Sequence, residues 1–112
     1  MKFVSLMTFA LLSVSAFASK VELSCGLYHN LELVDTVQVV LQDQQKNKVV
    51  QEYGMFQVIL SSTGLDEIEL QVLNLMDPSR SYATGTLKNT GEKIQLSIWT
   101  REFILDSKCT KI

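Results

Sequence analysis

The sequence predicts a small all-β protein, an antiparallel β-sandwich or barrel of six to seven strands stapled by one disulfide. Three observations lead to this expectation. Apolar and polar residues alternate over most of the chain beyond residue 20, which is the pattern of half-buried strands. Short polar turns separate these segments, as in sandwiches and small barrels. Two cysteines follow a predicted secretory signal, and an even cysteine count in an exported protein indicates a disulfide.

The N-terminal segment, residues 1–18, is predicted to be a cleavable signal peptide. Lys2 precedes an uncharged, largely apolar run, and Ala16 and Ala18 occupy the −3 and −1 positions of an A-x-A cleavage site. A transmembrane anchor is disfavoured because it needs roughly 20 continuous apolar residues, whereas serine and threonine interrupt this shorter run. Cleavage after Ala18 would leave residues 19–112 as a single secreted or periplasmic domain.

The charge of the remaining chain narrows the range of partners. Removing Lys2 leaves nine basic and twelve acidic residues, a net charge of −3. Nucleic acids and anionic membrane surfaces are recognised by clustered Lys and Arg, so we expect neither as a partner. No second stretch is apolar enough to span a bilayer, so no membrane insertion is expected. A cationic partner is permitted by this charge but not indicated by it.

Cys25 and Cys109 are the only cysteines, so only one intramolecular pairing exists. It would join the first predicted strand to the last and close nearly the whole domain into a loop, which is worth about 4–5 kcal/mol in the chain-entropy model. A redox site would need C-x-x-C, and a zinc site would need several Cys and His. The chain has neither pattern, so we expect a structural disulfide.

The first half of the domain contains three predicted β segments. Residues 21–28 and 36–41 each alternate apolar with polar side chains, as strands with one buried face do. Residues 42–48 are polar throughout and predict an exposed hairpin loop. Residues 49–60 form one long β-prone segment, in which Gly54 suggests a bulge or a sharp bend.

The next segment leaves an alternative open. Residues 61–64 predict a turn because they combine serine, threonine and glycine. Residues 65–76 contain good helix formers and begin with acidic residues that could serve a helix N-terminus. However, their apolar positions at 68, 70 and 72, and then 73 and 75, fit the period of a strand better than that of a helix.

The last part of the chain predicts three strands. A turn at residues 77–81 contains the only proline, which fixes the backbone at its entry. A short strand follows at residues 82–87, and residues 89–92 have the composition of a tight hairpin. The final strands are expected at residues 94–99 and 103–109. The terminal strands would then be neighbours in space.

Catalytic and metal-binding signatures are absent from the sequence. His29 is the only histidine and stands in a predicted loop, without a G-x-S-x-G motif or an unpaired cysteine to supply a nucleophile. The densest acidic group is Asp66, Glu67 and Glu69. We expect a solvated strand face there, with a calcium site or a carboxylate pair for hydrolysis as the alternatives. No calcium loop or glycine-rich phosphate loop is present. We therefore predict no catalytic residue, no metal and no cofactor.

Three side chains are candidates for binding a partner: Trp99, Arg101 and Tyr82. Trp99 lies in phase with Gln95 and Ser97 on the polar face of its strand, and Arg101 follows on the same face. Tryptophan, tyrosine and arginine are enriched among interface hot spots. Alternatively, Trp99 covers one open end of a barrel and contributes to the core.

The leading functional hypothesis is a non-catalytic binding or inhibitory module that acts on another exported macromolecule. It follows from small size, export, a stapled scaffold and the absence of catalytic motifs. One alternative is a small-ligand carrier that uses the barrel interior, although about ninety residues leave little room for a cavity. A further alternative is a hydrolytic enzyme that uses His29 and a carboxylate. An exposed apolar patch around Trp99 would favour the binding module.

Overall fold

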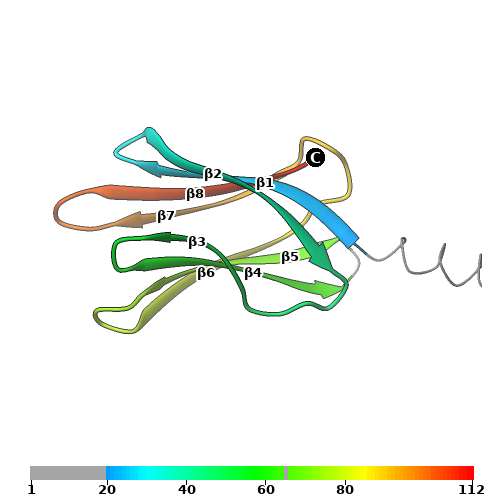
Figure 1. Cartoon of the computed structure of the whole chain (residues 1–112), viewed down its shortest axis with the longest axis horizontal. Helices are drawn as coiled ribbons and strands as arrows, with labels where there is room; N and C mark the ends of the chain where they lie inside the picture. Colours follow the sequence, from blue (N-terminus) through cyan, green and yellow to red (C-terminus); the bar gives the residue numbers. More distant parts are fainter. Residues whose placement is uncertain (1–19, 65) are drawn as a thin grey trace, which may run out of the picture.

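Two antiparallel four-stranded sheets pack face to face (Figure 1). The computed structural model describes residues 20–64 and 66–112; the predicted signal peptide and its cleavage site after Ala18 lie outside these residues. The strands are β1 (Lys20–His29), β2 (Glu32–Gln42), β3 (Lys48–Tyr53), β4 (Phe56–Gly64), β5 (Glu67–Asn74), β6 (Ser79–Thr86), β7 (Lys93–Trp99) and β8 (Ile104–Lys111). The all-β sandwich is confirmed, with eight strands rather than six or seven.

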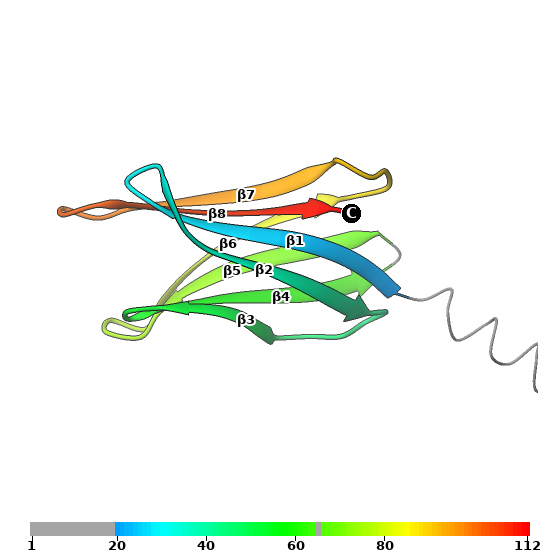
Figure 2. The same ribbon diagram turned by 45° about the horizontal axis from the view of Figure 1, so that its top comes forward.

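The sheets have the strand orders β2-β1-β8-β7 and β3-β4-β5-β6 (Figure 2). The chain first makes the β1–β2 hairpin, then builds the whole second sheet as a meander. It returns to the first sheet with β7 and β8, and β8 pairs with β1. The first and last strands are therefore neighbours, as predicted, and β2, β7, β3 and β6 form the edges of the sandwich.

The additional strand arises within residues 49–60, which form two strands rather than one. Gly54 has a φ of +57°, and Tyr53 pairs with Phe56 across the two-residue turn. A positive φ at this position carries no steric penalty for glycine, and such turns match the twist of a hairpin. The sharp bend predicted at Gly54 is therefore a complete reversal of the chain.

Four predicted turns differ from the structure. Residues 42–48 lead from β2 in one sheet to β3 in the other, so they do not close the predicted hairpin. The turn predicted at residues 77–81 ends before Ser79, where β6 begins. Residues 61–64 continue β4 and pair with β5 as far as Gly64 and Glu67; the backbone enters the left-handed region at Asp66, with φ +63°. Residues 89–92 do form a turn, closed by Glu92 N–H donating to the Asn89 carbonyl at 3.1 Å. However, this turn carries the chain from β6 in one sheet to β7 in the other, so it does not close a hairpin.

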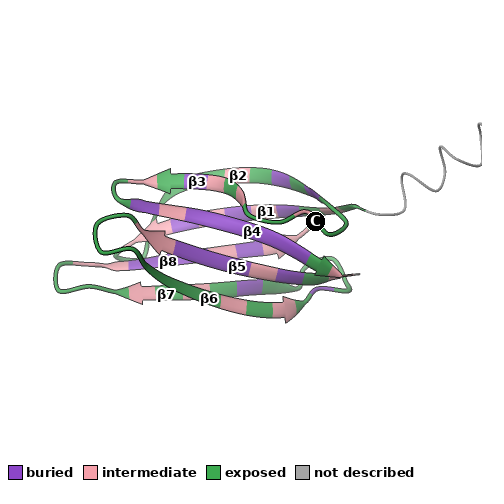
Figure 3. Cartoon of the chain, turned by 90° about the horizontal axis from the view of Figure 1, so that it is seen from below, coloured by how far each residue is buried: buried purple, intermediate pink, exposed green. Residues whose placement is uncertain are grey.

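The core fills the space between the sheets (Figure 3). The side chains of β5 at positions 68, 70 and 72 point into the core. Residues 67–74 therefore form a strand and not the alternative helix. The central strands are buried most, whereas β6 is largely exposed. Fifteen buried residues make up the cluster: Leu23, Cys25, Leu27, Val39, Leu41, Phe56, Val58, Leu60, Ile68, Leu70, Val72, Leu87, Ile94, Leu105 and Cys109.

The predicted disulfide is present between Cys25 and Cys109. The two cysteines lie directly opposite each other on β1 and β8, and both are fully buried. They are separated by 84 positions in the sequence. The bridge therefore fastens the first strand to the last at the centre of one sheet, in agreement with an oxidising compartment for the protein.

Candidate functional site

The two ends of the sandwich expose different kinds of side chain. The β1–β2, β3–β4, β5–β6 and β7–β8 connections gather at one end, on the left in Figure 1, which we refer to as the loop end. Two connections at the opposite end contain polar stretches, Asp43-Gln44-Gln45-Lys46-Asn47 and Lys88-Asn89-Thr90-Gly91-Glu92. Among the described residues, eleven large apolar side chains are exposed, and seven lie in or beside the loop-end connections: Leu31, Leu33, Val34, Met55, Leu75, Met76 and Trp99.

Exposure at the loop end is greatest where the backbone turns. Leu31 is 77 % exposed, Met76 72 % and Trp99 76 %. Turns are usually made of Gly, Pro, Asn, Asp and Ser, because these residues satisfy or relax the turning backbone. Clustered exposed apolar side chains mark interaction sites in monomeric proteins. The loop end is therefore the candidate functional site.

The β1–β2 turn places a leucine in a strained backbone conformation. Asn30 has φ +51° and Leu31 has φ +72°. Two successive residues with positive φ form the type of hairpin turn that favours Asn-Gly, and a side chain with a Cβ at the second position is strained by about 1–3 kcal/mol. Fold stability alone would favour glycine here. The strained leucine therefore points to a role for its exposed side chain.

Backbone hydrogen bonds join the loop-end connections in pairs. In the first sheet, Asn30 N–H donates to the Ile104 carbonyl at 2.9 Å, and Ile104 N–H donates to Asn30 Oδ1 at 3.0 Å. In the second sheet, Leu75 N–H donates to the Met55 carbonyl at 2.8 Å. Each sheet thus holds two of its connections in a fixed relation.

An aromatic cluster joins the two sheets beneath these connections. The hydroxyl of Tyr53 lies 2.7 Å from Nδ1 of His29. The ring of Phe103 meets His29 edge-on, with centroids 4.8 Å apart, and meets Phe56 edge-on at 5.9 Å. Edge-to-face packing is a favoured geometry for aromatic pairs. The cluster gives the loop end a firm base that spans both sheets.

A surface cavity of about 290 Å³ opens between the β3–β4, β5–β6 and β7–β8 connections. Its apolar lining comes from Met55, Phe56, Met76 and Phe103, and Arg101 also lines it. In the described part of the chain, the Arg101 guanidinium has no hydrogen-bond or ion-pair partner. Methionine side chains adapt their shape to a ligand. The cavity is suited to an apolar side chain that lies beside a carboxylate.

Local hydrogen bonds hold the β5–β6 connection that carries Met76. The Met76 N–H donates to Asn74 Oδ1 at 3.0 Å, and the Ser79 N–H donates to Asp77 Oδ1 at 3.1 Å. Hydrogen bonds from the Ser79 side chain and backbone hold the pKa of Asp77 below its usual value. These hydrogen bonds give the loop that presents Met76 a defined shape.

The three sequence-predicted binding residues do not form one surface. Trp99 is the last residue of β7 and lies on its outer face in the predicted phase with Gln95 and Ser97. Tyr82 is 63 % exposed but lies in the middle of β6, on the outer face of the other sheet. The structure therefore places Trp99 at the loop end and Tyr82 away from it.

Arg101 reaches the loop end in a different way from the one predicted. Strand pairing stops at Trp99 and Ile104, and Thr100 N–H then donates to the Phe103 carbonyl at 2.9 Å. The chain turns at this point, so Arg101 does not continue the outer face of β7. It lines the cavity between the connections instead.

Sequence reasoning missed the other apolar residues of the loop end. Leu31 stands where the first predicted strand breaks off, and Met55 was expected inside a single long strand. Met76 follows a strand and precedes the proline turn. The available signal was the occurrence of large apolar side chains beside predicted turns, where polar residues are usual.

The imidazole of His29 is in contact with aromatic side chains. Its contacts are the hydroxyl of Tyr53 and the rings of Tyr53 and Phe103. Within residues 20–64 and 66–112 it has no hydrogen bond or ion pair with a carboxylate. A hydrolytic pair would need the histidine and the acid within hydrogen-bond reach of the reacting group. The observed role of His29 is to pack and hydrogen-bond at the base of the loop end.

Neither the described residues nor the known proteins indicate a chemical class for this site. Within the part of the chain that the structure describes, no three His, Cys, Asp or Glu side chains gather as a possible metal site, and no helix has the length and apolar character to cross a membrane. Comparisons of the chain with models of known families, with curated proteins and with solved structures found no match. The exposed surface of the sandwich is therefore the main evidence for its function.

Proposed function

We propose that this protein is a non-catalytic binding or inhibitory module for another exported protein, which it holds at the loop end. The observation that carries the proposal is the gathering of exposed apolar side chains on the four connections of one end. Exposed clusters of this kind are the usual mark of a protein interface. At the opposite end, the described stretches 43–47 and 88–92 contain no large apolar side chain.

The composition and rigidity of the loop end support a protein partner. Trp, Met, Phe and Arg are enriched in the centres of protein interfaces, and Trp99, Met76, Phe103 and Arg101 supply all four types. Binding residues are often presented on loops that a rigid β-sandwich holds in place. Because the connections are hydrogen-bonded in pairs, less conformational freedom would be lost on binding.

The cavity indicates which feature of the partner would be bound. Its apolar lining would receive an apolar side chain, and the unpaired Arg101 guanidinium would meet a carboxylate next to it. A lipid surface fits less well, because a bilayer presents no single side chain to a concave site. Glu102 also lines the cavity, and its carboxylate would lose its contact with water when a partner binds there.

Trp99→Ala and Met76→Ala are each expected to weaken partner binding by about 2 kcal/mol, or roughly thirtyfold. Both side chains are exposed, so the free energy of unfolding should change by under about 0.5 kcal/mol. The partner would first be captured from the exported fraction with the wild-type protein, and affinities would then be measured by calorimetry. Val49→Ala is the matched control, because Val49 is 46 % exposed and lies on β3 away from the loop end.

Two results would contradict this proposal. One is an equal loss of affinity in Val49→Ala and Met76→Ala, since the loop end would then have no special part in binding. The other comes from the fluorescence of Trp99, the only tryptophan. A blue shift on adding vesicles of zwitterionic lipid, reversed by Met76→Asp, would assign the loop end to a membrane surface instead of a protein.

Leu31→Gly is expected to separate binding from stability. Glycine relieves the positive-φ strain of about 1–3 kcal/mol but adds about 0.5–1 kcal/mol of backbone entropy to the unfolded chain. The midpoint of thermal unfolding should therefore stay the same or rise, while affinity for the partner falls. Gln44→Gly, which relieves a positive φ of 57° in the β2–β3 connection at the opposite end, is the control and should retain affinity. A clear fall in stability with unchanged affinity would show that Leu31 serves the fold alone.

A further inference from the structure

The four edge strands of the sandwich are not equally protected. Free backbone groups on an edge can pair with another chain, and bulges or charged side chains normally prevent this. β2 has a register shift with Val34 as its extra residue, and β3 has one at Val50. The Lys48 ammonium also donates a hydrogen bond to the Val40 carbonyl at 3.0 Å, which links the edge strands β2 and β3 of the two sheets. β7 pairs with β8 without a register shift, and apart from the exposed Lys93 at its start and the bulky Trp99 at its end it has no such protection.

β6 lacks these devices over most of its length. It pairs with β5 without a register shift from Glu67 and Thr86 to Asn74 and Ser79. Its only charged residue is Arg80, close to its start. The six residues Ser81-Tyr82-Ala83-Thr84-Gly85-Thr86 contain no charge and no proline. This stretch is therefore a regular, neutral edge that is open to pairing.

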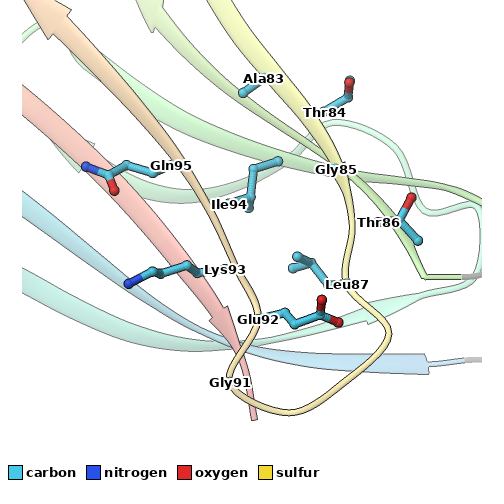
Figure 4. Close-up of a pocket in the computed structure, with 10 residues that line it drawn as sticks. All are labelled: Ala83, Thr84, Gly85, Thr86, Leu87, Gly91, Glu92, Lys93, Ile94 and Gln95. Atoms are coloured by element: carbon cyan, nitrogen blue, oxygen red, sulfur yellow. The ribbon is translucent and has the colours of Figure 1, made fainter.

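A groove of mixed polar and apolar lining runs along the inner side of this stretch, between β6 and β7; its polar lining includes Thr84, Thr86, Glu92, Lys93 and Gln95. The groove has a volume of about 480 Å³, and its lining includes Ala83, Gly85, Leu87 and Ile94. Figure 4 shows Ile94 reaching from β7 toward β6. A Cβ placed on Gly85 would lie 3.6 Å from Ile94 Cδ1, and Leu87 and Ile94 are both buried. An added strand would therefore meet the small residues Ala83 and Gly85 above a buried apolar floor.

An acidic hollow lies on the outer side of the same stretch. It has a volume of about 540 Å³, and its lining includes Glu67, Glu69, Thr84 and Thr86. Glu67 stands opposite Thr86 in the sheet, and Glu69 stands opposite Thr84. In the described residues neither carboxylate has a Lys or Arg partner. Glu67 accepts a hydrogen bond from Thr63 and Glu69 accepts one from Gln71. Two carboxylates without a cation therefore lie one strand in from the edge, beside short threonine side chains.

We propose that the edge of β6 from Ser81 to Thr86 binds an extended segment of a partner protein as a ninth strand, and that this segment alternates apolar with basic residues. Successive side chains of an added strand point to opposite faces. The apolar ones would enter the groove above Ile94, and the basic ones would reach across Thr84 and Thr86 to the two glutamates. Added strands are a recurring mode of peptide recognition, in which backbone hydrogen bonds give affinity and side-chain pockets give specificity.

A second copy of this chain does not meet these requirements. If two β6 strands paired, each would present Ser81, Ala83 and Gly85 toward the groove of the other, and these side chains are too small to fill it. Each β6 would bring Arg80 as its single cation, and one cation does not balance both Glu67 and Glu69. The site is separate from the loop end, so either proposal can fail without affecting the other.

The test uses peptides of defined pattern and the protein without its signal peptide. The probe is a short capped peptide that alternates valine with lysine. One control peptide alternates valine with glutamate, and a second has the first composition with its lysines grouped at one end. Binding is followed by NMR, through shifts and hydrogen-exchange protection of the backbone amides. The alternating valine–lysine peptide should protect backbone amides of β6 from exchange. Both control peptides should bind at least about tenfold more weakly.

Two sets of variants make the site assignment specific. Ser81→Lys places a charge at an exposed inward position of β6 and should weaken binding of the valine–lysine peptide by about tenfold or more. Thr36→Lys, the matched change on the exposed edge strand β2, should leave it unchanged. The double change Glu67→Gln and Glu69→Gln should reduce the preference for lysine over glutamate. Protection of β2 instead of β6, equal binding to Ser81→Lys, or no binding of the valine–lysine peptide would overturn the proposal.

Discussion

Replacing both Cys25 and Cys109 with alanine is expected to lower the free energy of unfolding by about 4–5 kcal/mol. The bridge closes a loop whose ends are 84 positions apart, so it removes a large part of the conformational freedom of the unfolded chain. Domains of this kind are typically stable by about 5–15 kcal/mol, so the variant would unfold readily. Denaturant unfolding followed by circular dichroism measures the change.

The reduced wild-type protein is the natural control for this variant. It keeps both buried sulfur atoms but lacks the covalent link, so its stability should fall nearly as far as that of the double variant. A native protein that reacts with a thiol reagent at two sulfhydryls would show that the bridge does not form. A reduced protein as stable as the oxidised one would show that the loop-closure argument is wrong.

Phe56→Ala is expected to destabilise the protein by about 3–5 kcal/mol. Phe56 is 7 % exposed, belongs to the core cluster, and packs edge-on against Phe103 at the base of the loop end. Removing its ring would leave a cavity and free Phe103 to move. We therefore expect loss of partner binding even under conditions where the variant remains folded, measured by calorimetry after unfolding curves have set those conditions.

Leu60→Ala is the matched control for Phe56→Ala. Leu60 is fully buried in the same strand but takes no part in the loop-end cavity. Its truncation should cost a similar 2–5 kcal/mol and leave the affinity of the folded protein unchanged. If both variants reduce affinity equally, the effect is one of general stability, and the aromatic base has no particular role in the site.

The sequence was sufficient to predict the strands with one buried face and the pairing of the cysteines. The alternation through residues 21–28 and 94–99 predicts which side chains enter the core, because the period of a strand allows only two faces. The disulfide follows from having two cysteines and one possible pairing. Both inferences depend on local pattern or on counting, and neither requires knowledge of the topology.

Features that depend on which strands pair could not be predicted in this way. Residues 49–60 are β-prone on both sides of Gly54, so nothing in the pattern distinguishes a bend within a strand from a hairpin. Residues 89–92 form the expected tight turn, but turn chemistry is the same whether the next strand stays in the sheet or crosses to the other. Only the tertiary arrangement decides between these outcomes.

The candidate site could likewise be predicted only in part. The outward phase of Trp99 could be predicted from its own strand, whereas the position of Arg101 depends on where pairing with β8 stops. Leu31, Met55 and Met76 are far apart in the sequence and lie in three different connections. Their convergence follows from the alternating directions of eight antiparallel strands, which bring every second connection to the same end of the sandwich.

The pairing of β8 with β1 has a consequence for the order of folding. The meander from β3 to β6 consists of neighbours in sequence, so it can form early and locally. The first sheet cannot be completed until the last strand is available, because β8 separates β1 from β7. Contacts between such distant segments slow folding, and until they form the inner edge of β1 remains unpaired. The two cysteines lie opposite each other only when β8 fills that gap, so formation of the disulfide locks the chain in its final arrangement.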